Sequence, residues 1–481
     1  MRLPLESARG GARGGVADSK MCGIVGICGH SEASTLAYLS LYALQHRGQE
    51  SAGIVTADGG ELTRRASMGQ VADVFSRDVL DSLPGRAAIG HVRYSTSGDS
   101  NPANAQPFLL RHHRGPIAIA HNGNLVNAGL IRSDLEAEGS IFQTTSDTET
   151  VLHLAARAQV PDVVDALVES LRQVRGAYSL VALVPGRLIA ARDPLGWRPL
   201  SIGRVDGAWV VASETCAFDL LGAEYIREIE RGEIVVLDVA GCHSFKPFPA
   251  ERPAHCFFEH VYFARPDSMI FGESVQAVRK RLGAALHGEH PVDADVVVPV
   301  PDSGVYAALG YSQAAGIPFE LGLVRNHYIG RTFIEPTQQI RNFGVRIKLN
   351  PVREILRGKR IALIDDSIVR GTTSGKIVQL CRDAGAREVH VLISCPPTIG
   401  PCHYGIDTPV REELIASRQS VEEIRKYIKA DSLGYLSLDG MLRAAAKDSN
   451  EVCTACWSDN QPVALPIGEG EQLDLFDKSQ R

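Results

Sequence analysis

Cys22 is a candidate nucleophile because it stands at the start of a segment that predicts a β-strand. Residues 21–27 alternate in the manner of a strand. On composition alone, a buried strand cysteine is the better interpretation of a thiol in this position. Polar clusters at the ends of other predicted elements favour a catalytic interpretation, because active sites collect at such places. These clusters span residues 46–51, 91–96, 121–125 and 146–149.

The clusters resemble the N-terminal-nucleophile glutaminase domain of class II glutamine amidotransferases. The resemblance implies that Cys22 attacks the glutamine amide, and that its own α-amino group, with an ordinary pKa of about 7.7–8.0, is the base. It also implies an oxyanion hole made by the side chain of Asn122 and the backbone N–H of Gly123. Arg93 would bind the α-carboxylate of glutamine, and Asp147 the α-ammonium. The implied glutamine-binding residues are Arg47, Arg93 and Asp147.

Each of these motifs also has a purely structural interpretation. Asp147 could be only the N-cap of a helix, and residues 122–124 could be only a tight turn. Taken singly, each structural interpretation is the better one. The set of motifs together favours the glutaminase site.

The first residues of the chain bear on the nucleophile. Residues 1–20 are rich in Gly, Arg and Ala and contain no apolar stretch of a secretory signal. Residues 1–21 are either a propeptide or a mis-assigned leader, with Met21 as the true initiator. Both interpretations make Cys22 the mature N-terminus, provided that residues up to Met21 are removed.

A second motif predicts an anion site in the other half of the chain. Residues 360–364 form a predicted buried strand, followed by Asp365 and Asp366, a loop rich in Gly, Thr and Ser, and a helix from about Gly375. This order places backbone N–H groups and hydroxyls at a helix N-terminus. The spacing is not that of a P-loop. The two carboxylates would instead engage sugar hydroxyls or hydrated Mg²⁺.

This motif resembles the phosphoribosyl pyrophosphate (PRPP) motif of type I phosphoribosyltransferases. The resemblance implies that the two aspartates contact the ribose hydroxyls and the metal, and that residues 369–374 hold the 5-phosphate. It places a pyrophosphate loop at residues 299–304. The implied PRPP-binding residues are Asp365, Asp366, Ser367, Arg370, Gly371, Thr372, Thr373, Ser374, Arg331 and Lys348, and the implied Mg²⁺ ligands are Ser303, Asp365 and Asp366.

Residues 325–348 are strongly basic, with Glu335 as the one acidic residue. Alone, such a run is best interpreted as a solvated surface loop. Beside a phosphate motif, it resembles the mobile loop that closes over PRPP, where cationic side chains would neutralise pyrophosphate and exclude water. Its basic residues are Arg325, Arg331, Arg341, Arg346 and Lys348.

Together the two halves resemble the amidophosphoribosyltransferase family over about residues 22–460. The implied reaction converts glutamine, PRPP and water to 5-phosphoribosylamine, pyrophosphate and glutamate, the first committed step of purine synthesis. Ammonia would pass between the two sites along a dry path, because ammonium is a poor nucleophile. The resemblance further implies glutamine and PRPP as substrates, feedback inhibition by purine nucleotides (AMP, GMP, ADP), and a homotetramer.

Cys453 and Cys456 form a C-x2-C pair near the C-terminus, and Cys256 and Cys402 stand apart from them in the sequence. A lone C-x2-C pair could be incidental, and four such thiolates could hold either Zn²⁺ or a [4Fe–4S] cluster. The resemblance favours the cluster, since some family members carry one together with a cleaved propeptide. Cys395 is an alternative third ligand, and we prefer Cys402. The cluster would be structural, because the reaction needs no redox step.

The elements that must position these residues differ between the halves. Residues 22–240 contain many short strands and few helices, and the resemblance predicts an α+β, four-layer αββα glutaminase domain. Residues 256–460 alternate strands and helices, which predicts an α/β phosphoribosyltransferase domain with a parallel sheet. Residues 461–481 would be a C-terminal tail.

Composition excludes several other classes of protein. The chain has 481 residues, 44% of them hydrophobic, and a net charge of −6, which disfavours a dedicated nucleic-acid binder. It contains no apolar run of about 20 residues, as a membrane span would need. The chain has ten cysteines, which is far below the cysteine density of a small disulfide-stabilised protein. This low density indicates a reducing, cytoplasmic compartment.

Two rival functions remain. Hexosamine-phosphate and asparagine synthetases share the glutaminase half, but residues 365–374 argue against both. A PRPP or nucleotide sensor without catalysis would require a blocked Cys22.

Overall fold

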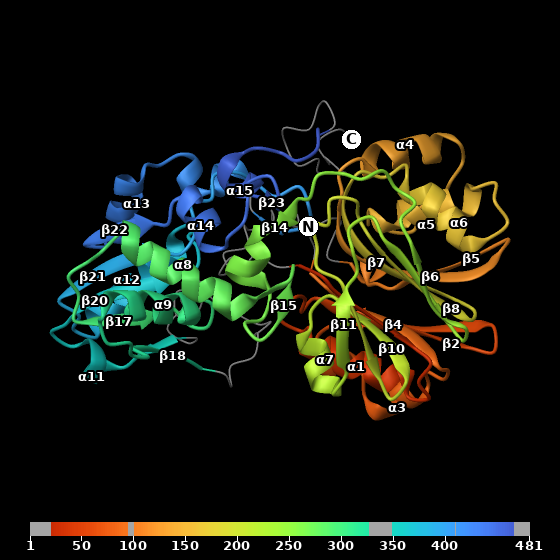
Figure 1. Ribbon diagram of the computed structural model, residues 1–481, viewed down its shortest axis with the longest axis horizontal. Helices are drawn as coiled ribbons and strands as arrows, with labels where there is room; N and C mark the ends of the chain where they lie inside the picture. Colours follow the sequence, from red (N-terminus) through yellow and green to blue (C-terminus); the bar gives the residue numbers. More distant parts are fainter. Residues whose placement is uncertain (1–20, 95–100, 327–348, 409, 466–481) are drawn as a thin grey trace, which may run out of the picture.

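The structure is a computed structural model, and it describes residues 21–94, 101–326, 349–408 and 410–465. The chain forms two halves that lie side by side (Figure 1). In the described part, the first half contains antiparallel sheets of seven and six strands, and the second half contains a parallel sheet of four strands.

The seven-stranded sheet has the order β11-β9-β10-β1-β4-β2-β3. Its strands are β1 (Gly23–Cys28), β2 (Ser51–Asp58), β3 (Glu61–Met68), β4 (Ala87–Arg93), β9 (Ser201–Val205), β10 (Ala208–Ala212) and β11 (Glu224–Glu228). The helices next to it in sequence are α1 (Ala33–Ala43), α2 (Val71–Val74), α3 (Arg77–Asp81) and α7 (Cys216–Leu221).

The six-stranded sheet has the order β13-β12-β8-β7-β6-β5. Its strands are β5 (Phe108–His112), β6 (Gly115–Leu125), β7 (Gly176–Val184), β8 (Arg187–Arg192), β12 (Ile234–Asp238) and β13 (Gly241–Phe245). The accompanying helices are η1 (Pro102–Asn104), α4 (Ala128–Ala137), α5 (Thr148–Arg157) and α6 (Val163–Leu171).

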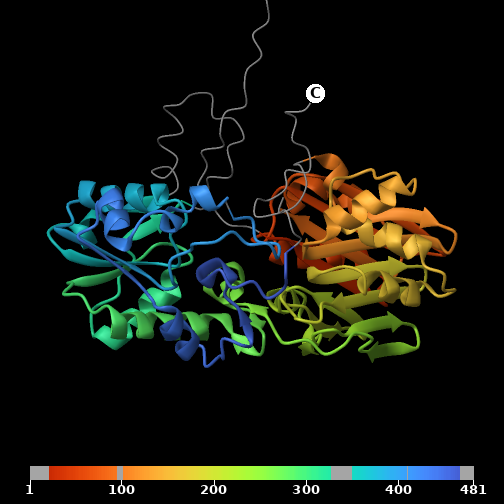
Figure 2. The same ribbon diagram turned by 90° about the horizontal axis from the view of Figure 1, so that it is seen from above.

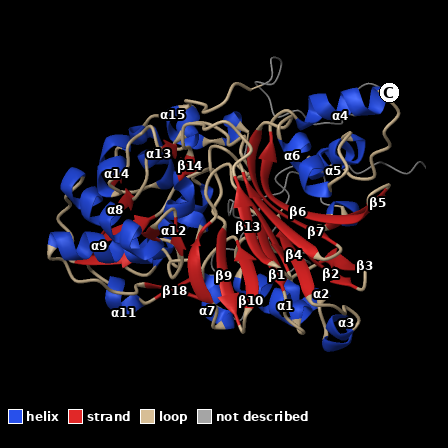
Figure 3. Cartoon of the chain, turned by 45° about the vertical axis from the view of Figure 1, so that its right-hand side comes forward, coloured by secondary structure: helices blue, strands red, loops and turns tan. Residues whose placement is uncertain are grey.

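Alternating side chains on β1 explain why the two sheets stack. Ile24 and Cys28 face a core shared with the second sheet, while Val25 and Ile27 face the core beneath α1 and α7. A third core lies between the second sheet and α4, α5 and α6. The first half is therefore four-layered, αββα, as predicted, with helices outside both stacked sheets (Figure 3).

The second half is built on the parallel order β17-β20-β21-β22. Strand β20 reads Arg-Ile-Ala-Leu-Ile-Asp, and its buried run at 361–364 is typical of a strand covered on both faces. The strands are β17 (Val296–Pro299), β20 (Arg360–Asp365), β21 (Glu388–Ile393) and β22 (Ser432–Tyr435). The helices are α8 (Val275–Glu289), α9 (Val305–Ala315), α11 (Arg353–Leu356), α12 (Thr372–Asp383), α13 (Val421–Ile428) and α14 (Leu438–Ala444), with short turns η3 (Arg411–Glu413) and η4 (Ile415–Ser417). A small hairpin consists of β18 (Leu323–Arg325) and β19 (Leu349–Pro351).

A junction segment connects the halves, and the C-terminal part of the chain returns to it. Strand β14 (His255–Cys256) pairs in parallel with β23 (Val452–Cys453), so residues about 200 positions apart meet there. The segment continues through a π-helix, η2 (Glu259–Phe263), and the pair β15 (Met269–Ile270) and β16 (Glu273–Ser274). Helix α15 (Ala455–Ser458) follows β23, and this region lies between the halves (Figure 2).

Within the described ranges, no helix is long and apolar enough to cross a membrane.

Candidate active sites

Cys22 lies immediately before β1, where the register of β1 and β4 brings it opposite Arg93. The thiol is 7% exposed, and its Sγ lies 3.7 Å from the carbonyl oxygen of Tyr94. Burial raises the pKa of the Cys22 thiol, while the positive charge of Arg93 acts to lower it. A thiol with a raised pKa is protonated at neutral pH, so its attack requires a base.

Arg93 and Asp147 lie near the thiol, since the charges of both act on Cys22. Nη1 of Arg93 donates to Oε1 of Glu50 at 2.8 Å. Asp147 accepts from the backbone N–H of Leu125 at 2.9 Å. Asp147 stands at the N-cap position of α5 without capping it through its side chain, and its carboxylate acts on the Cys22 thiol.

Asn122 and Gly123 lie within β6 and do not form a tight turn, so that alternative is wrong. The side chain of Asn122 is fully buried, and within the described residues neither its Nδ2 nor its Oδ1 has a hydrogen-bond partner. Gly123 has φ +151°, and a Cβ there would lie 2.0 Å from the carbonyl oxygen of Ala177. Glycine is thus required at 123, and the amide of Asn122 is available to a ligand.

Arg47, which was predicted to bind glutamine, is held by groups of the protein itself. Its guanidinium is fully buried, and Nε donates to the carbonyl oxygen of Cys22 at 2.9 Å. Nη2 donates to Glu259 at 2.8 Å, and Nη1 donates to Glu214. Buried charges need such partners, and these partners hold Arg47 behind the nucleophile. The carboxylates that pair with Arg47 lie far away in sequence.

The predicted PRPP residues of the described chain line one cavity of about 500 Å³. Asp365 and Asp366 lie at the end of β20, and Ser367 donates its hydroxyl to Asp366 at 2.6 Å. Removal from bulk water raises the pKa of both carboxyls, and the charge of Asp366 raises that of Asp365 further. The predicted residues that line the cavity are Ser303, Asp365, Asp366, Ser367, Arg370, Gly371, Thr372, Thr373 and Ser374. Arg331 and Lys348 lie outside the described residues.

Helix α12 begins at Thr372, three residues before the predicted start at Gly375. The reason is Gly371, whose φ of +74° gives the chain a left-handed turn at the N-cap position. Thr372, Thr373 and Ser374 therefore form the first helical turn, where backbone N–H groups are free of intrahelical partners. This correction strengthens the predicted anion site.

Several cavity residues were missed by the sequence analysis. His46 and Gln49 reach the cavity from the first half, and Arg265 reaches it from the junction segment. Arg279 on α8 also lines the cavity, and burial lowers the pKa of this guanidinium to about 10. The motif at 46–51 could have indicated His46 and Gln49, but Arg279 stands in no recognisable pattern.

The predicted cluster cysteines gather at the junction of the halves. Cys256 and Cys453 are register partners of β14 and β23. Burial and the charges of Cys256, Cys453 and Cys402 raise the pKa of Cys456. Cys395 also acts on Cys456, but it lies beside the two aspartates of the PRPP cavity.

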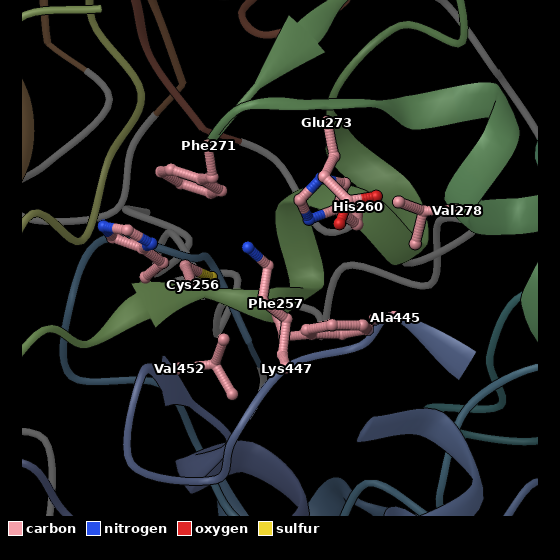
Figure 4. A pocket seen from close by; sticks show the side chains of 10 residues that line it. Cys256, Phe257, His260, Phe271, Glu273, Val278, Ala445, Lys447 and Val452 are labelled. Carbon is pink, nitrogen blue, oxygen red and sulfur yellow. The ribbon is translucent and has the colours of Figure 1, made fainter. Parts of the chain in front are cut away.

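Among the described residues, no three His, Cys, Asp or Glu side chains lie close enough together to hold a metal ion. Cys256 borders a pocket of about 10 Å³ with Phe271 and Lys447, which has room for roughly one water (Figure 4).

Comparisons with known proteins agree with this arrangement. A family model described as a glutamine amidotransferase domain matches residues 91–219. An amidophosphoribosyltransferase of Glycine max, described as chloroplastic, is 53% identical over 94% of this chain and 79% of the relative. One of Bacillus subtilis is 50% identical over 92% of this chain and 94% of the relative. A solved B. subtilis structure, described as glutamine PRPP amidotransferase complexed with ADP and GMP, has a TM-score of 0.89 and 49% identity, covering 93% of this chain and 98% of that one.

Proposed function

This chain belongs to the amidophosphoribosyltransferase family, and from that premise we propose how its own residues convert glutamine, PRPP and water to 5-phosphoribosylamine, pyrophosphate and glutamate. One observation supports the proposal above the others. A single cavity is lined by Asp365 and Asp366 on one side and by His46 and Gln49, which flank Arg47, on the other. The wall of the PRPP cavity thus includes residues of the first half that neighbour Arg47 in sequence, and Arg47 contacts the carbonyl oxygen of Cys22.

In the glutaminase step, Cys22 attacks the side-chain amide of glutamine. Because burial raises the pKa of this thiol, its proton must pass to a base, and the α-amino group of Cys22 can take it once residues 1–21 are removed. Asn122 and Gly123 donate to the oxyanion, and the free amide of Asn122 supports that role. The proton then goes to the leaving ammonia, and water hydrolyses the thioester.

Arg93 and Asp147 bind the α-carboxylate and α-ammonium of glutamine in this proposal. Both are buried, so their charges are strong in a medium of low dielectric constant. Arg47 is reassigned from substrate binding to positioning, because its Nε holds the carbonyl oxygen of Cys22.

In the transfer step, ammonia displaces pyrophosphate from C1 of PRPP. Asp365 and Asp366 orient the ribose hydroxyls, and the first turn of α12 holds the 5-phosphate. Ser303, Asp365 and Asp366 would hold Mg²⁺, which neutralises charge on the pyrophosphate leaving group when bound. Paired carboxylates with raised pKa values suit such a cation, because it relieves their mutual repulsion.

The proposal extends to features beyond the two reactions. Cys256, Cys402, Cys453 and Cys456 would hold a structural [4Fe–4S] cluster, and a cleaved propeptide goes with it. All ten cysteines are free, which suits a reducing, cytoplasmic compartment. Purine nucleotides such as AMP, ADP and GMP would inhibit, supported by the ADP and GMP in the B. subtilis complex, and the enzyme would be a homotetramer.

The test compares wild type with Cys22→Ala, using glutamine or ammonium as the nitrogen source, while glutamate and pyrophosphate are measured. Wild type should use both sources with PRPP, and the variant should use only ammonium. Loss of both activities in the variant would contradict the separation of the two sites, and a wild type inactive with both sources would refute the function.

Two measurements on the same purified protein test its processing and its metal. Mass spectrometry of the active protein should find Cys22 at the N-terminus, and a chain still beginning at Met1 would refute the proposed base. Elemental analysis should find iron with labile sulfide, and zinc in its place would refute the cluster.

A further inference from the structure

The carboxylate of Glu214 is fully buried where the two halves of the chain meet. Its Oε1 accepts from Nε2 of His46 at 2.8 Å and from Nη1 of Arg47. Its Oε2 accepts from the backbone N–H of Arg265 at 2.9 Å and from the hydroxyl of Ser268 at 2.8 Å. Although burial acts to raise it, the charges of His46 and Arg47 hold the pKa of Glu214 well below its usual range.

The partners of Glu214 lead to two different sites. Arg47 also donates to the carbonyl oxygen of Cys22 at 2.9 Å. Glu214 therefore contacts the side chain that holds the backbone of the nucleophilic residue. His46 and Arg265 line the PRPP cavity, so two of the other contacts of Glu214 are made with residues of the cavity wall. The imidazole of His46 is 26% exposed, and it can meet an anion in the cavity.

We propose that Glu214 is a positioning residue that couples occupation of the PRPP cavity to the placement of Cys22. The inference rests on the proposed function and adds to it the residue that carries the coupling. A polyanion in the cavity attracts the cationic groups on its wall, which changes their hydrogen bonds to Glu214. An unpaired member of a buried ionic cluster is costly, so a shift of Glu214 must be accompanied by a shift of Arg47. The carbonyl group of Cys22, which accepts from Arg47, then shifts as well.

Glu214→Gln is the direct test, because it keeps the shape of the side chain but removes its charge. Glutamate release from glutamine is measured with and without PRPP, together with phosphoribosylamine synthesis from ammonium. The ratio of glutaminase rates with and without PRPP should fall by about tenfold or more, since misplacing a reacting group is that costly. The synthesis rate with ammonium and the KM for PRPP in that reaction should stay within about twofold of wild type.

Glu233→Gln is the matched control. Glu233 is also buried and ion-paired, to Arg227 at 2.7 Å, but it touches neither Cys22 nor the cavity. This variant should retain the full ratio of glutaminase rates with and without PRPP, called the PRPP ratio below. An equal fall of the ratio in both variants would overturn the inference, because any buried charge would then have the same effect.

The outcomes separate the inference from the function on which it rests. If wild type makes phosphoribosylamine from glutamine while Glu214→Gln keeps the full PRPP ratio, the inference alone is wrong. If Glu214→Gln loses both activities equally, its role is structural and the inference is again wrong. If wild type makes no phosphoribosylamine, the proposed function itself fails.

Ser268→Ala keeps the inference testable if Glu214→Gln does not fold. It removes one hydrogen bond from Glu214 without altering a cavity-lining side chain or Arg47. The PRPP ratio should fall by about tenfold, in line with the loss of one hydrogen bond to a charged group. An unchanged ratio in a folded Ser268→Ala protein would overturn the coupling.

Discussion

The side chain of Asn122, a proposed residue of the glutaminase site, is buried without the partners that burial normally demands among the described residues. Asn122 is fully buried, yet within the described chain its amide has no hydrogen-bond partner. Leaving such a group unsatisfied costs about 1–3 kcal/mol, which the fold must offset elsewhere. The cost is reasonable where a ligand completes the hydrogen bonds, because a donor fixed in advance needs no reorganisation during the reaction.

Asn122→Ala should therefore reduce glutamine-dependent synthesis by about 10²–10³-fold, because one oxyanion donor is lost. Ammonium-dependent synthesis should be nearly unchanged, since that reaction does not use the oxyanion hole. Ser179→Ala is the control, because Ser179 is buried and is the register partner of Asn122 in β7. A loss below tenfold in Asn122→Ala would argue against this role.

His91 predicts a pH dependence of stability. Burial lowers the pKa of His91 to about 3, against an ordinary value of 6.5. The stability that the neutral imidazole contributes is thus fully present above pH 6.5 and is lost as the pH falls toward 3. Between pH 6.5 and 5, wild type should lose about 2 kcal/mol more free energy of unfolding than His91→Gln, measured by urea denaturation. Parallel pH curves for the two proteins would contradict this assignment.

At the scale of elements, the segment that carries Cys402 packs against β6, the strand that carries the proposed oxyanion donors Asn122 and Gly123. The side chain of Asn124 on β6 donates to the carbonyl oxygen of His403 at 2.8 Å. Arg198 donates through Nε to the carbonyl oxygen of Tyr404 at 3.1 Å, and Trp197 stacks on Tyr404 at 4.5 Å. The second half of the chain therefore supports the glutaminase site directly.

Gly405→Ala should damage that support. Gly405 has φ +100°, and a Cβ there would lie 2.6–2.8 Å from the backbone of Gly123, which must shift. Glutamine-dependent synthesis should fall by about 10²-fold, as expected for a displaced oxyanion donor, while ammonium-dependent synthesis remains. Gly358→Ala is the control for backbone strain alone, because Gly358 has φ +74° and open space around it. Equal effects of the two substitutions would rule out the contact as the cause.

At the scale of the whole molecule, sequence patterns and the family resemblance predicted the fold, whereas contacts between the halves were not predictable. Strand patterns in the first half and strand–helix alternation in the second are short-range signals that predicted the sheets, while the αββα layers and the residues at 365–374 that line the cavity were implied by the family resemblance. The pairing of Arg47 with Glu214 and Glu259 spans 167 and 212 residues. Such a pairing leaves no period or spacing in the sequence, so the partners of Arg47 could not be predicted.

The same long-range pairing predicts how the two halves hold together. Glu259 begins the π-helix of the junction, is fully buried, and binds Arg47 at 2.8 Å and Arg198 at 3.4 Å. Glu259→Ala would remove one carboxylate shared by two buried guanidinium groups. The free energy of unfolding should fall by about 3–5 kcal/mol, because an uncompensated buried charge costs that much.

Glu259→Gln is the matched variant for this prediction, since it keeps the shape and one acceptor oxygen and should lose less stability. Both variants should also become more sensitive to proteases at residues 255–274, because the junction is held by these contacts. Unchanged urea unfolding of Glu259→Ala would mean that the buried pairs add nothing to the association of the halves. In that case the apolar core around Phe257 and Phe258 would hold the junction by itself.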